Sequence, residues 1–364
     1  MLRRFEVTGF KNFKNTIAID FSDVHDYKFN SECITNGLIS KMIIYGKNSV
    51  GKSNLGLAIF DIVSHLTDKN VTPSLYDYYL NSDGYESVTF KYDFVFNDDL
   101  IEYCYTKDKK RVLLTEQISL NGTKLFYYNY TQKKGVFSEL RKLNPTLNLN
   151  FEDVDSILRY FINNTSISDS HPLKKMIKYV SSMLWFRNLD ENRYIGYKRN
   201  TKDYFDFLYD EDTLGEFQIF LHKSGVDDHL IIREDTDGIK RLYFDHETPL
   251  PFMKTASSGT KALYTFFYWY KTAKNVSLMF IDEFDAYYHY ELSESIVKLV
   301  EKMTDTQVIL TSHNTNLLSN RIMRPDCYFI LSHDKITSLV NATSRELREG
   351  HNLEKLYMSG EFNE

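Results

Sequence analysis

The stretch Gly46-Lys47-Asn48-Ser49-Val50-Gly51-Lys52-Ser53 has two glycines separated by four residues and followed by a lysine and a hydroxyl side chain. This pattern is typical of a P-loop, in which the glycines let backbone N–H groups curve around a phosphate. The helix that follows such a loop adds its positive end to the same phosphate. We therefore expect Lys52 to contact the β- and γ-phosphates of a nucleotide and Ser53 to hold Mg²⁺.

The flanks of this loop predict a strand before it and a helix after it. Residues 38–45 form a compact apolar run that ends at Gly46, as expected of a strand buried on both faces. From Ser53 to about Thr67, apolar residues recur at helical spacing. Strand, glycine loop and helix therefore follow one another, which is the context that a P-loop requires.

A second motif indicates what chemistry follows phosphate binding. Residues 278–283, Leu-Met-Phe-Ile-Asp-Glu, form an apolar strand that ends in two adjacent carboxylates. Such a pair can deliver one carboxylate to a magnesium shell and the other to an attacking water. We predict that Asp282 has the metal role and that Glu283 is the base in ATP hydrolysis.

Two shorter elements narrow the class of site. Ser257-Ser258-Gly259 precedes an apolar helix, so a hydroxyl and a glycine lie at a helix amino terminus, where anions bind. His313 follows the apolar strand 308–311, where its imidazole could donate to a γ-phosphate or to a water. The order and spacing of the four elements favour a functional role for each of them.

The rest of the chain predicts an α/β protein with a mixed sheet, an antiparallel β meander and a helical insert. Alternating aromatic residues and an Asn121-Gly122 turn place the meander at 85–131. Helical spacing dominates after about residue 150, and buried strands alternate with a helix after residue 251, as in a parallel sheet. We divide the chain into an N-terminal ATPase lobe (1–138), a mainly helical insert or lid (139–250) and a C-terminal ATPase lobe (251–364).

Composition limits the cellular context. The formal net charge is −6 over 364 residues, so no chain-wide attraction to phosphate backbones or anionic lipid exists. The three cysteines form neither a zinc pattern nor a disulfide framework, and no apolar stretch has the length of a signal peptide or membrane span. We expect a cytoplasmic protein without a membrane partner.

These motifs together resemble the ATP-binding-cassette class of ATPase heads, and within it the AAA_15 and OLD-like branch related to SMC and RecF-type proteins. Residues 47–54, Lys-Asn-Ser-Val-Gly-Lys-Ser-Asn, resemble the Walker A motif of that branch, which adds Asn54 to the expected nucleotide-binding residues. The turn 257–260 resembles its reduced signature motif, residues 282–285 its Walker B motif, and His313 its switch histidine. The segments 7–13 and 352–360 are similar to the opening and closing segments of the same branch.

The resemblance implies ATP and Mg²⁺ as cofactors, hydrolysis of ATP, and a homodimer or higher oligomer joined through the ATP sites. In this class the signature of one subunit closes on the γ-phosphate held by the P-loop of another. It further implies an oligomeric sensor or scaffold in bacterial anti-phage defence that controls a separate effector, such as a nuclease, through its nucleotide state. The resemblance places no Q-loop, for which Gln117, Gln132 and Gln218 are candidates.

Two other functions stay open at this point. A DNA-binding repair ATPase of the SMC or RecF kind would use the basic cluster 107–111, Lys-Asp-Lys-Lys-Arg, although Asp108 dilutes its charge. A nuclease would hold metals on Asp282, Glu283 and Asp285, but the 51 residues that follow His313 are fewer than the nuclease domain of OLD-type proteins needs. The trigger, the partner, the subunit number and the role of the insert are not determined by the sequence.

Overall fold

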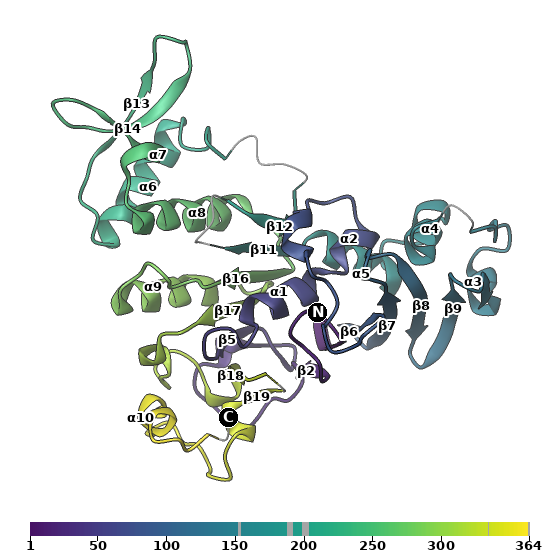
Figure 1. Cartoon of the computed structure of the whole chain (residues 1–364). Coiled ribbons are helices and arrows are strands. Elements are labelled where there is room, and N and C mark those ends of the chain that lie inside the picture. Colours follow the sequence, from purple (N-terminus) through teal and green to yellow (C-terminus); the bar gives the residue numbers. More distant parts are fainter. Residues whose placement is uncertain (152–153, 188–191, 199–203, 334, 363–364) are drawn as a thin grey trace.

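The structure is a computed structural model that describes residues 1–151, 154–187, 192–198, 204–333 and 335–362 (Figure 1). Within these residues, two seven-stranded sheets form the body of the molecule. We call them the parallel sheet, with strand order β12-β11-β16-β17-β5-β18-β19, and the meander sheet, with order β10-β9-β8-β7-β6-β1-β2. The predicted α/β fold with a mixed sheet and an antiparallel meander is therefore confirmed.

The parallel sheet carries the motifs. Neighbouring strands from β11 through β16, β17 and β5 to β18 run parallel, so their carboxyl ends meet at one edge. All residues of β5, β16, β17 and β18 are buried, which explains their continuous apolar runs. The strands are β5 (Lys41–Tyr45), β11 (Leu184–Arg187), β12 (Tyr194–Gly196), β16 (Leu278–Asp282), β17 (Gln307–Ser312), β18 (Tyr328–Leu331) and β19 (Ile336–Ser338).

The meander sheet is antiparallel throughout. Asn121 and Gly122 join β8 to β9 with φ angles of 51° and 76°, as a type I′ turn requires. The strands are β1 (Leu2–Thr8), β2 (Ile17–Asp20), β6 (Val88–Phe96), β7 (Asp99–Lys107), β8 (Leu113–Leu120), β9 (Thr123–Asn129) and β10 (Lys134–Val136).

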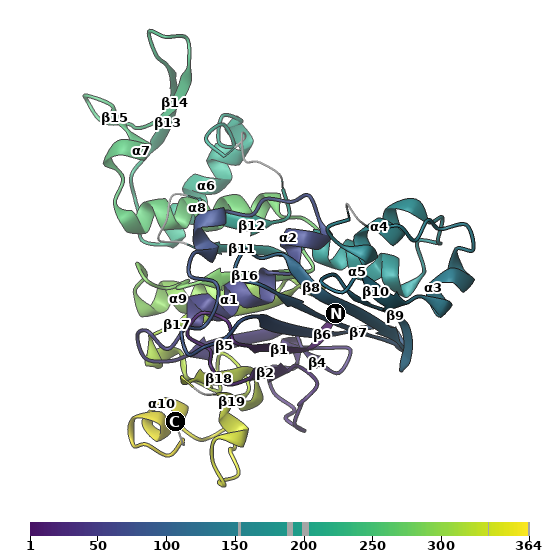
Figure 2. The same cartoon turned by 45° about the vertical axis from the view of Figure 1, so that its right-hand side comes forward.

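Helix α1 (Lys52–Phe60) lies between the two sheets (Figures 1 and 2). On one side, a Cβ at Gly56 would approach the Phe280 ring of β16 to 2.7 Å, so only glycine allows this close packing. On the other side, the Tyr92 hydroxyl of β6 donates to the Ala58 carbonyl at 3.0 Å. The helix predicted over 53–67 is interrupted, because a second helix, α2 (Val63–Leu66), follows Asp61.

The remaining elements surround this body. The small sheet β13–β15 and α7 stand away from the two large sheets in both views (Figures 1 and 2). The other helices are α3 (Ser138–Leu143), α4 (Ile157–Asn164), α5 (Pro172–Ser181), α6 (Glu211–Lys223), α7 (Phe252–Thr255), α8 (Ser258–Thr272), α9 (Tyr290–Glu301) and α10 (Leu353–Met358). The other strands are β3 (Ile34–Thr35), β4 (Leu38–Ile39), β13 (Leu230–Glu234), β14 (Lys240–Phe244) and β15 (Leu250–Pro251).

The segment predicted as a mainly helical insert, 139–250, contains more than helices. Besides α3 to α6 it supplies β11 and β12 to the parallel sheet. Helical spacing was predicted to dominate after about residue 150, and apolar residues follow it up to Leu184, but α5 ends at Ser181 and β11 begins at Leu184. A strand buried on both faces has no alternation, and its apolar residues therefore continued the helical spacing. The division at 138 and 250 stays a proposal.

None of the helices in the described ranges is both long enough and apolar enough to span a lipid bilayer.

Candidate functional site

The P-loop connects the end of β5 to the start of α1. Gly51 has a φ of 106°, and a Cβ there would lie 2.5 Å from Asn12 Nδ2. At Gly46, an added Cβ would lie 2.7 Å from the carbonyl oxygen of Leu331 on β18. Both glycines of the motif are therefore required by backbone conformation or by close packing. Residues 47–49 lie between the two glycines and are exposed, and Ser49 also has a positive φ of 67°.

Asn12 supports this loop from the opening segment of the chain. Its Nδ2 donates to the Val50 carbonyl at 2.8 Å, and its Oδ1 accepts from Asn54 Nδ2 at 2.7 Å. One side chain thus connects the loop to the first turn of α1. Sequence reasoning noted the segment 7–13 but gave Asn12 no role. It also predicted that Asn54 binds nucleotide, whereas here the Asn54 side chain is engaged with Asn12.

Lys52 is buried and folded back over its own loop. Its Nζ donates to the carbonyls of Gly46 at 2.8 Å and Lys47 at 3.2 Å, and lies 3.3 Å from His313 Nδ1. Burial lowers the pKa of Lys52, and the nearby carboxylates, Glu283 first, oppose that shift. Burial and the Lys52 charge lower the pKa of His313 below its usual value, so the imidazole is neutral at pH 7. The structure therefore brings together the lysine of the loop and the predicted switch histidine.

Thr311 of β17 hydrogen-bonds to both acidic residues at the end of β16, Asp282 and Glu283. The Thr311 hydroxyl donates to Asp282 Oδ1 at 2.9 Å and accepts from the Glu283 backbone N–H at 2.7 Å. Glu283 has a φ of 49°, a left-handed conformation that is uncommon for a residue with a side chain. Such a backbone persists where its surroundings hold it, and here the Thr311 hydroxyl fixes the Glu283 N–H.

Asp282 is fully buried, and burial raises its pKa. The neighbouring Ser53 hydroxyl, the Arg187 charge and the Thr311 hydroxyl oppose that rise. Among the described residues, Asp282 Oδ2 has no hydrogen-bond partner, although Arg187 Nε lies 3.6 Å away. A buried carboxylate oxygen without a donor is costly unless another positive group completes its surroundings.

Ser53 and Asp282 fit a magnesium ion in this sense, because one offers a hydroxyl and the other a buried carboxylate oxygen. In the described part of the chain, no cluster of three or more His, Cys, Asp or Glu side chains could hold a metal without further ligands. Magnesium at nucleotide sites is held by few protein ligands, with phosphate oxygens and waters supplying the rest. The donor set therefore matches a nucleotide-dependent ion better than a metal centre made by protein alone.

Arg187 is a site residue that sequence reasoning missed. It ends β11, pairs in register with Asp282, and its Nη2 lies 2.8 Å from Glu283 Oε2. The candidate glutamines lie on other elements, since Gln117 is on β8, Gln218 is on α6 and Gln132 follows β9. The apolar run 184–186 could have indicated a buried strand that ends at Arg187. It was overlooked because its residues also continue the helical spacing of the preceding segment.

The predicted signature turn caps helix α8. The Ser257 hydroxyl accepts from the Thr260 N–H at 3.1 Å, as an N-cap residue does. Ser257 and Ser258 are exposed, and a Cβ at Gly259 would lie 3.4 Å from the Tyr287 carbonyl oxygen. The turn therefore packs against the segment that follows Glu283, while both serine residues stay exposed.

A P-loop at the end of the central parallel strand β5, with a histidine after β17 and two carboxylates at the end of β16, is the arrangement of a P-loop nucleotide-binding site. The chain belongs to the AAA_21 family, described as "AAA domain, putative AbiEii toxin, Type IV TA system", whose model matches residues 41–319. No curated protein matches the sequence. The narrower resemblance to the AAA_15 and OLD-like branch stays a proposal.

Three solved structures illustrate what the fold is similar to, each at 14% sequence identity and each covering 93% of this chain. One is an Smc head bound to the C-winged helix domain of ScpA, with a TM-score of 0.47 and 97% of that chain covered. Another is the SMC head domain from Thermotoga maritima, with a TM-score of 0.42 and 98% covered. A third is an Smc head domain with an extended coiled coil, bound to the C-terminal domain of ScpA derived from Pyrococcus furiosus. Its TM-score is 0.45, and 96% of that chain is covered.

Proposed function

We propose that this protein binds and hydrolyses ATP at the edge of the parallel sheet. The observation that carries the proposal is the convergence there of Lys52, the carboxylate pair 282–283 and His313, with Lys52 Nζ 3.3 Å from His313 Nδ1. These groups come from the P-loop and from the ends of two strands, β16 and β17, which are far from the loop in the sequence. Their convergence supports a common substrate that carries negative charge.

In this proposal the chain's own residues divide the work. The N–H groups of the loop 46–51 and Lys52 bind the phosphates of ATP, and Lys52 exchanges its contacts with Gly46 and Lys47 for them. Glu283 accepts a proton from a water whose oxygen attacks the γ-phosphorus, and ADP leaves as the phosphoanhydride bond breaks. His313, neutral at pH 7, positions the water or the γ-phosphate by a hydrogen bond.

Magnesium, when bound by Ser53 and Asp282, would offset phosphate charge and polarise the γ-phosphoryl group. The raised pKa of Asp282 does not prevent this role, because a nearby cation favours the ionised carboxylate. The Thr311 hydroxyl donates to Asp282 Oδ1 and so orients the carboxylate. Asp282 Oδ2 is then the oxygen that would contact the metal ion.

We further propose that two copies close around two ATP molecules through the signature turn. Ser257, Ser258 and the N–H groups near Gly259 lie at a helix amino terminus, where they can stabilise a phosphate only within about 3 Å. The exposure of both serines supports a surface available to a second subunit. Loss of the γ-phosphate then weakens the dimer, so nucleotide state controls assembly.

The role that we propose for this switch is a sensor or scaffold in bacterial anti-phage defence, acting on a separate effector such as a nuclease. The family description refers to a putative toxin of a type IV toxin–antitoxin system, and this supports the proposed role in defence. We propose the cytoplasm as its location.

Two substitutions test the ATPase. Lys52→Ala should lose ATP binding, whereas Glu283→Gln should bind ATP with unchanged affinity, turn over 10²- to 10⁴-fold more slowly and accumulate as an ATP-dependent dimer. Turnover of Glu283→Gln at the wild-type rate would show that the base is misassigned. ATP titration, phosphate release and sedimentation velocity provide the three readouts.

The dimer has a test of its own. Gly259→Asp places a carboxylate in the signature turn, so it should abolish ATP-dependent dimerisation of the Glu283→Gln protein without changing ATP affinity. Gly215→Asp on α6, where a Cβ would meet no atom within 4 Å, is the matched control. Equal loss of dimer in both variants would argue against an interface at the signature turn.

The SMC- or RecF-like DNA-binding function is the alternative, and one feature bears on it directly. Lys107 of the basic cluster is 1% exposed and pairs with Asp61 at 2.6 Å, so it cannot contact a DNA backbone. Binding to plain duplex DNA that falls steeply with salt would favour this alternative. The nuclease function would need Asp282 and Glu283 as metal ligands. It has less support, because Arg187 contacts Glu283 and approaches Asp282 at the place where the metals would lie.

A further inference from the structure

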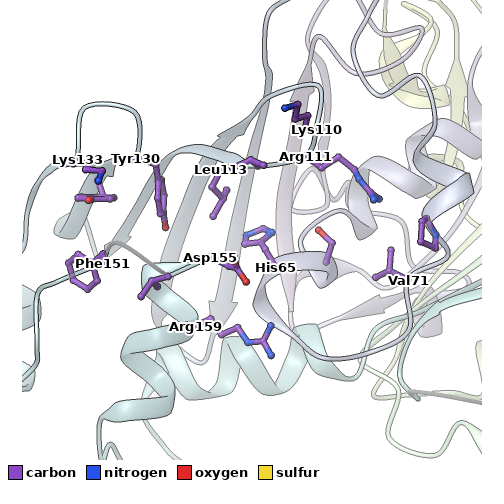
Figure 3. A pocket seen from close by; sticks show the side chains of 15 residues that line it. His65, Val71, Lys110, Arg111, Leu113, Tyr130, Lys133, Phe151, Asp155 and Arg159 are labelled. Carbon is purple, nitrogen blue, oxygen red and sulfur yellow. The ribbon is translucent and has the colours of Figure 1, made fainter.

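A second cavity lies away from the ATP site, between the meander sheet, α2 and α4 (Figure 3). Its volume is about 770 Å³, within the range of small-molecule sites. Four cationic side chains and one carboxylate line it, together with aromatic and aliphatic groups. The charged residues are Lys110, Arg111, Lys133, Arg159 and Asp155.

The positive charge of this cavity comes partly from the basic cluster 107–111, which the ATPase does not use. Lys107 turns inward to Asp61, whereas Lys110 and Arg111 line the cavity. Asp108 has a structural role in this turn, because its Oδ1 accepts the backbone N–H groups of Lys110 at 2.8 Å and Val112 at 2.9 Å. The acidic residue therefore shapes the turn that presents the two cations.

The turn is held in an uncommon conformation. Arg111 has a φ of 65°, and its N–H donates to the Asp108 carbonyl at 2.9 Å. Its guanidinium lies 5.5 Å from the Tyr76 ring centroid, which restricts where the charge can move. From the opposite side, Arg159 of α4 donates to the Thr67 carbonyl at 3.1 Å. Two arginines from distant segments are thus positioned on two sides of one cavity (Figure 3).

An aromatic wall completes the lining. Tyr130 is fixed because its hydroxyl donates to the buried Glu116 Oε2 at 2.5 Å. Phe151 and Tyr128 are almost fully buried and lie edge to face with ring centroids 5.6 Å apart. His65 lies on the floor, where burial and the charges of Lys107 and Arg159 hold its pKa well below the ordinary value. The floor is therefore uncharged.

We propose that this cavity binds a mononucleotide, that is, a phosphate ester that carries a planar ring. Arginine guanidinium groups recognise phosphate oxygens in bidentate fashion, and the half-buried Tyr130 is the aromatic side chain of the wall on which a base can stack. A free phosphate would leave the aromatic wall unused, and a nucleoside would leave the cations unused. The site is distinct from the P-loop, and binding there does not depend on ATP hydrolysis.

The test uses the full chain with Lys52→Ala, which removes nucleotide binding at the P-loop. AMP, GMP, CMP and UMP are titrated by calorimetry, with adenosine, inorganic phosphate and a single-stranded 12-mer of deoxythymidine as comparison probes. At least one mononucleotide should bind at one molecule per chain, at least tenfold more tightly than adenosine or phosphate. Wild-type protein saturated with a non-hydrolysable ATP analogue should give the same result, which guards against misfolding of the variant.

Two further variants locate the binding. Lys110→Ala together with Arg111→Ala should weaken mononucleotide binding at least tenfold, and Lys109→Ala should change it less than twofold, because Lys109 belongs to the same turn but does not line the cavity. Absence of binding up to about 1 mM, a standard free energy near −4 kcal/mol, would overturn the proposal. So would binding that the double variant leaves intact, or tighter binding of the 12-mer.

Discussion

Arg187 Nη2 lies 2.8 Å from Glu283 Oε2, so the proposed catalytic base is held by a cation from the neighbouring strand. The same guanidinium approaches Asp282 Oδ2 to 3.6 Å through Nε. One planar side chain thus faces both carboxylates of the motif. Because β11 and β16 pair with Arg187 opposite Asp282, the sheet register itself sets this relationship.

We expect Arg187→Ala to lower ATP turnover 10- to 100-fold while KM for ATP stays within about twofold. Hydrogen bonds to charged groups contribute about 1.5–3 kcal/mol, and here the contribution is the orientation of Glu283. Arg187→Lys should recover part of the rate, since it keeps the charge and loses the planar fork. Steady-state kinetics of the three proteins measure this effect, and a change confined to KM would instead indicate that Arg187 binds substrate.

Gly51→Ala should weaken ATP binding and lower stability, because the new Cβ would lie 2.5 Å from Asn12 Nδ2. Gly84→Ala is the matched control, since Gly84 also has a positive φ, 87°, but a Cβ there would meet no atom within 4 Å. The control should cost only the left-handed strain, about 1–2 kcal/mol. Denaturant melts and ATP titrations compare the two, and equal losses would mean that the Asn12 contact is unimportant.

The buried ion pair between Asp61 and Lys107 gives a third prediction. Both side chains are 1% exposed, and Asp61 also accepts from the Tyr79 and Tyr105 hydroxyls at 2.7 and 2.9 Å. Lys107→Met should destabilise the protein by about 3–5 kcal/mol, because it leaves a buried charge without its partner. The double change Asp61→Asn with Lys107→Met should cost less than the single change.

Exposed Lys109→Met is the control for this pair and should change stability by less than about 0.5 kcal/mol. Urea unfolding at pH 7 of the four proteins measures the differences. A double variant that is less stable than Lys107→Met would contradict the ion-pair interpretation.

Asp285 makes stability depend on pH. Burial raises the pKa of Asp285 from 3.8 to about 6, although the Ser312 hydroxyl donates to its Oδ2 at 2.6 Å. Between these two pH values the folded protein binds more protons than the unfolded chain, so the contribution of Asp285 to stability falls as pH rises. At about 1.4 kcal/mol per pKa unit, the loss by pH 7 is about 2–3 kcal/mol.

Asp285→Asn removes this titration. The free energy of unfolding of the variant relative to wild type should therefore increase between pH 4 and pH 7, by about 2–3 kcal/mol. Measuring the difference cancels other groups, such as Glu301, whose pKa burial raises to about 7. A difference that is independent of pH would show that Asp285 is ionised throughout.

The sequence predicted the parallel sheet and the position of its motifs because these features depend on local patterns. The run at 278–281 was predicted as a buried strand, and β16 with Asp282 at its end confirms this. The meander was equally readable, since Phe90, Tyr92 and Phe94 alternate with polar residues.

Other features depended on contacts between distant segments. Arg187 acquired its role only because β11 pairs with β16, and nothing in residues 184–187 alone separates a buried strand from a helix. The contact of Asn12 with Val50 also joins segments that are 38 positions apart. The role of Asp108 in shaping the turn 108–112 was also hidden, because sequence cannot show that this carboxylate is directed at backbone N–H groups.

The position of α1 between the two sheets has a mechanical consequence. Gly56 allows Phe280 to press on one side, Tyr92 holds the other, and the Asp61–Lys107 pair fastens the far end. A helix restrained in this way cannot swivel by itself when ATP arrives. We therefore expect α1 and the two sheets that it touches to move together when ATP binds.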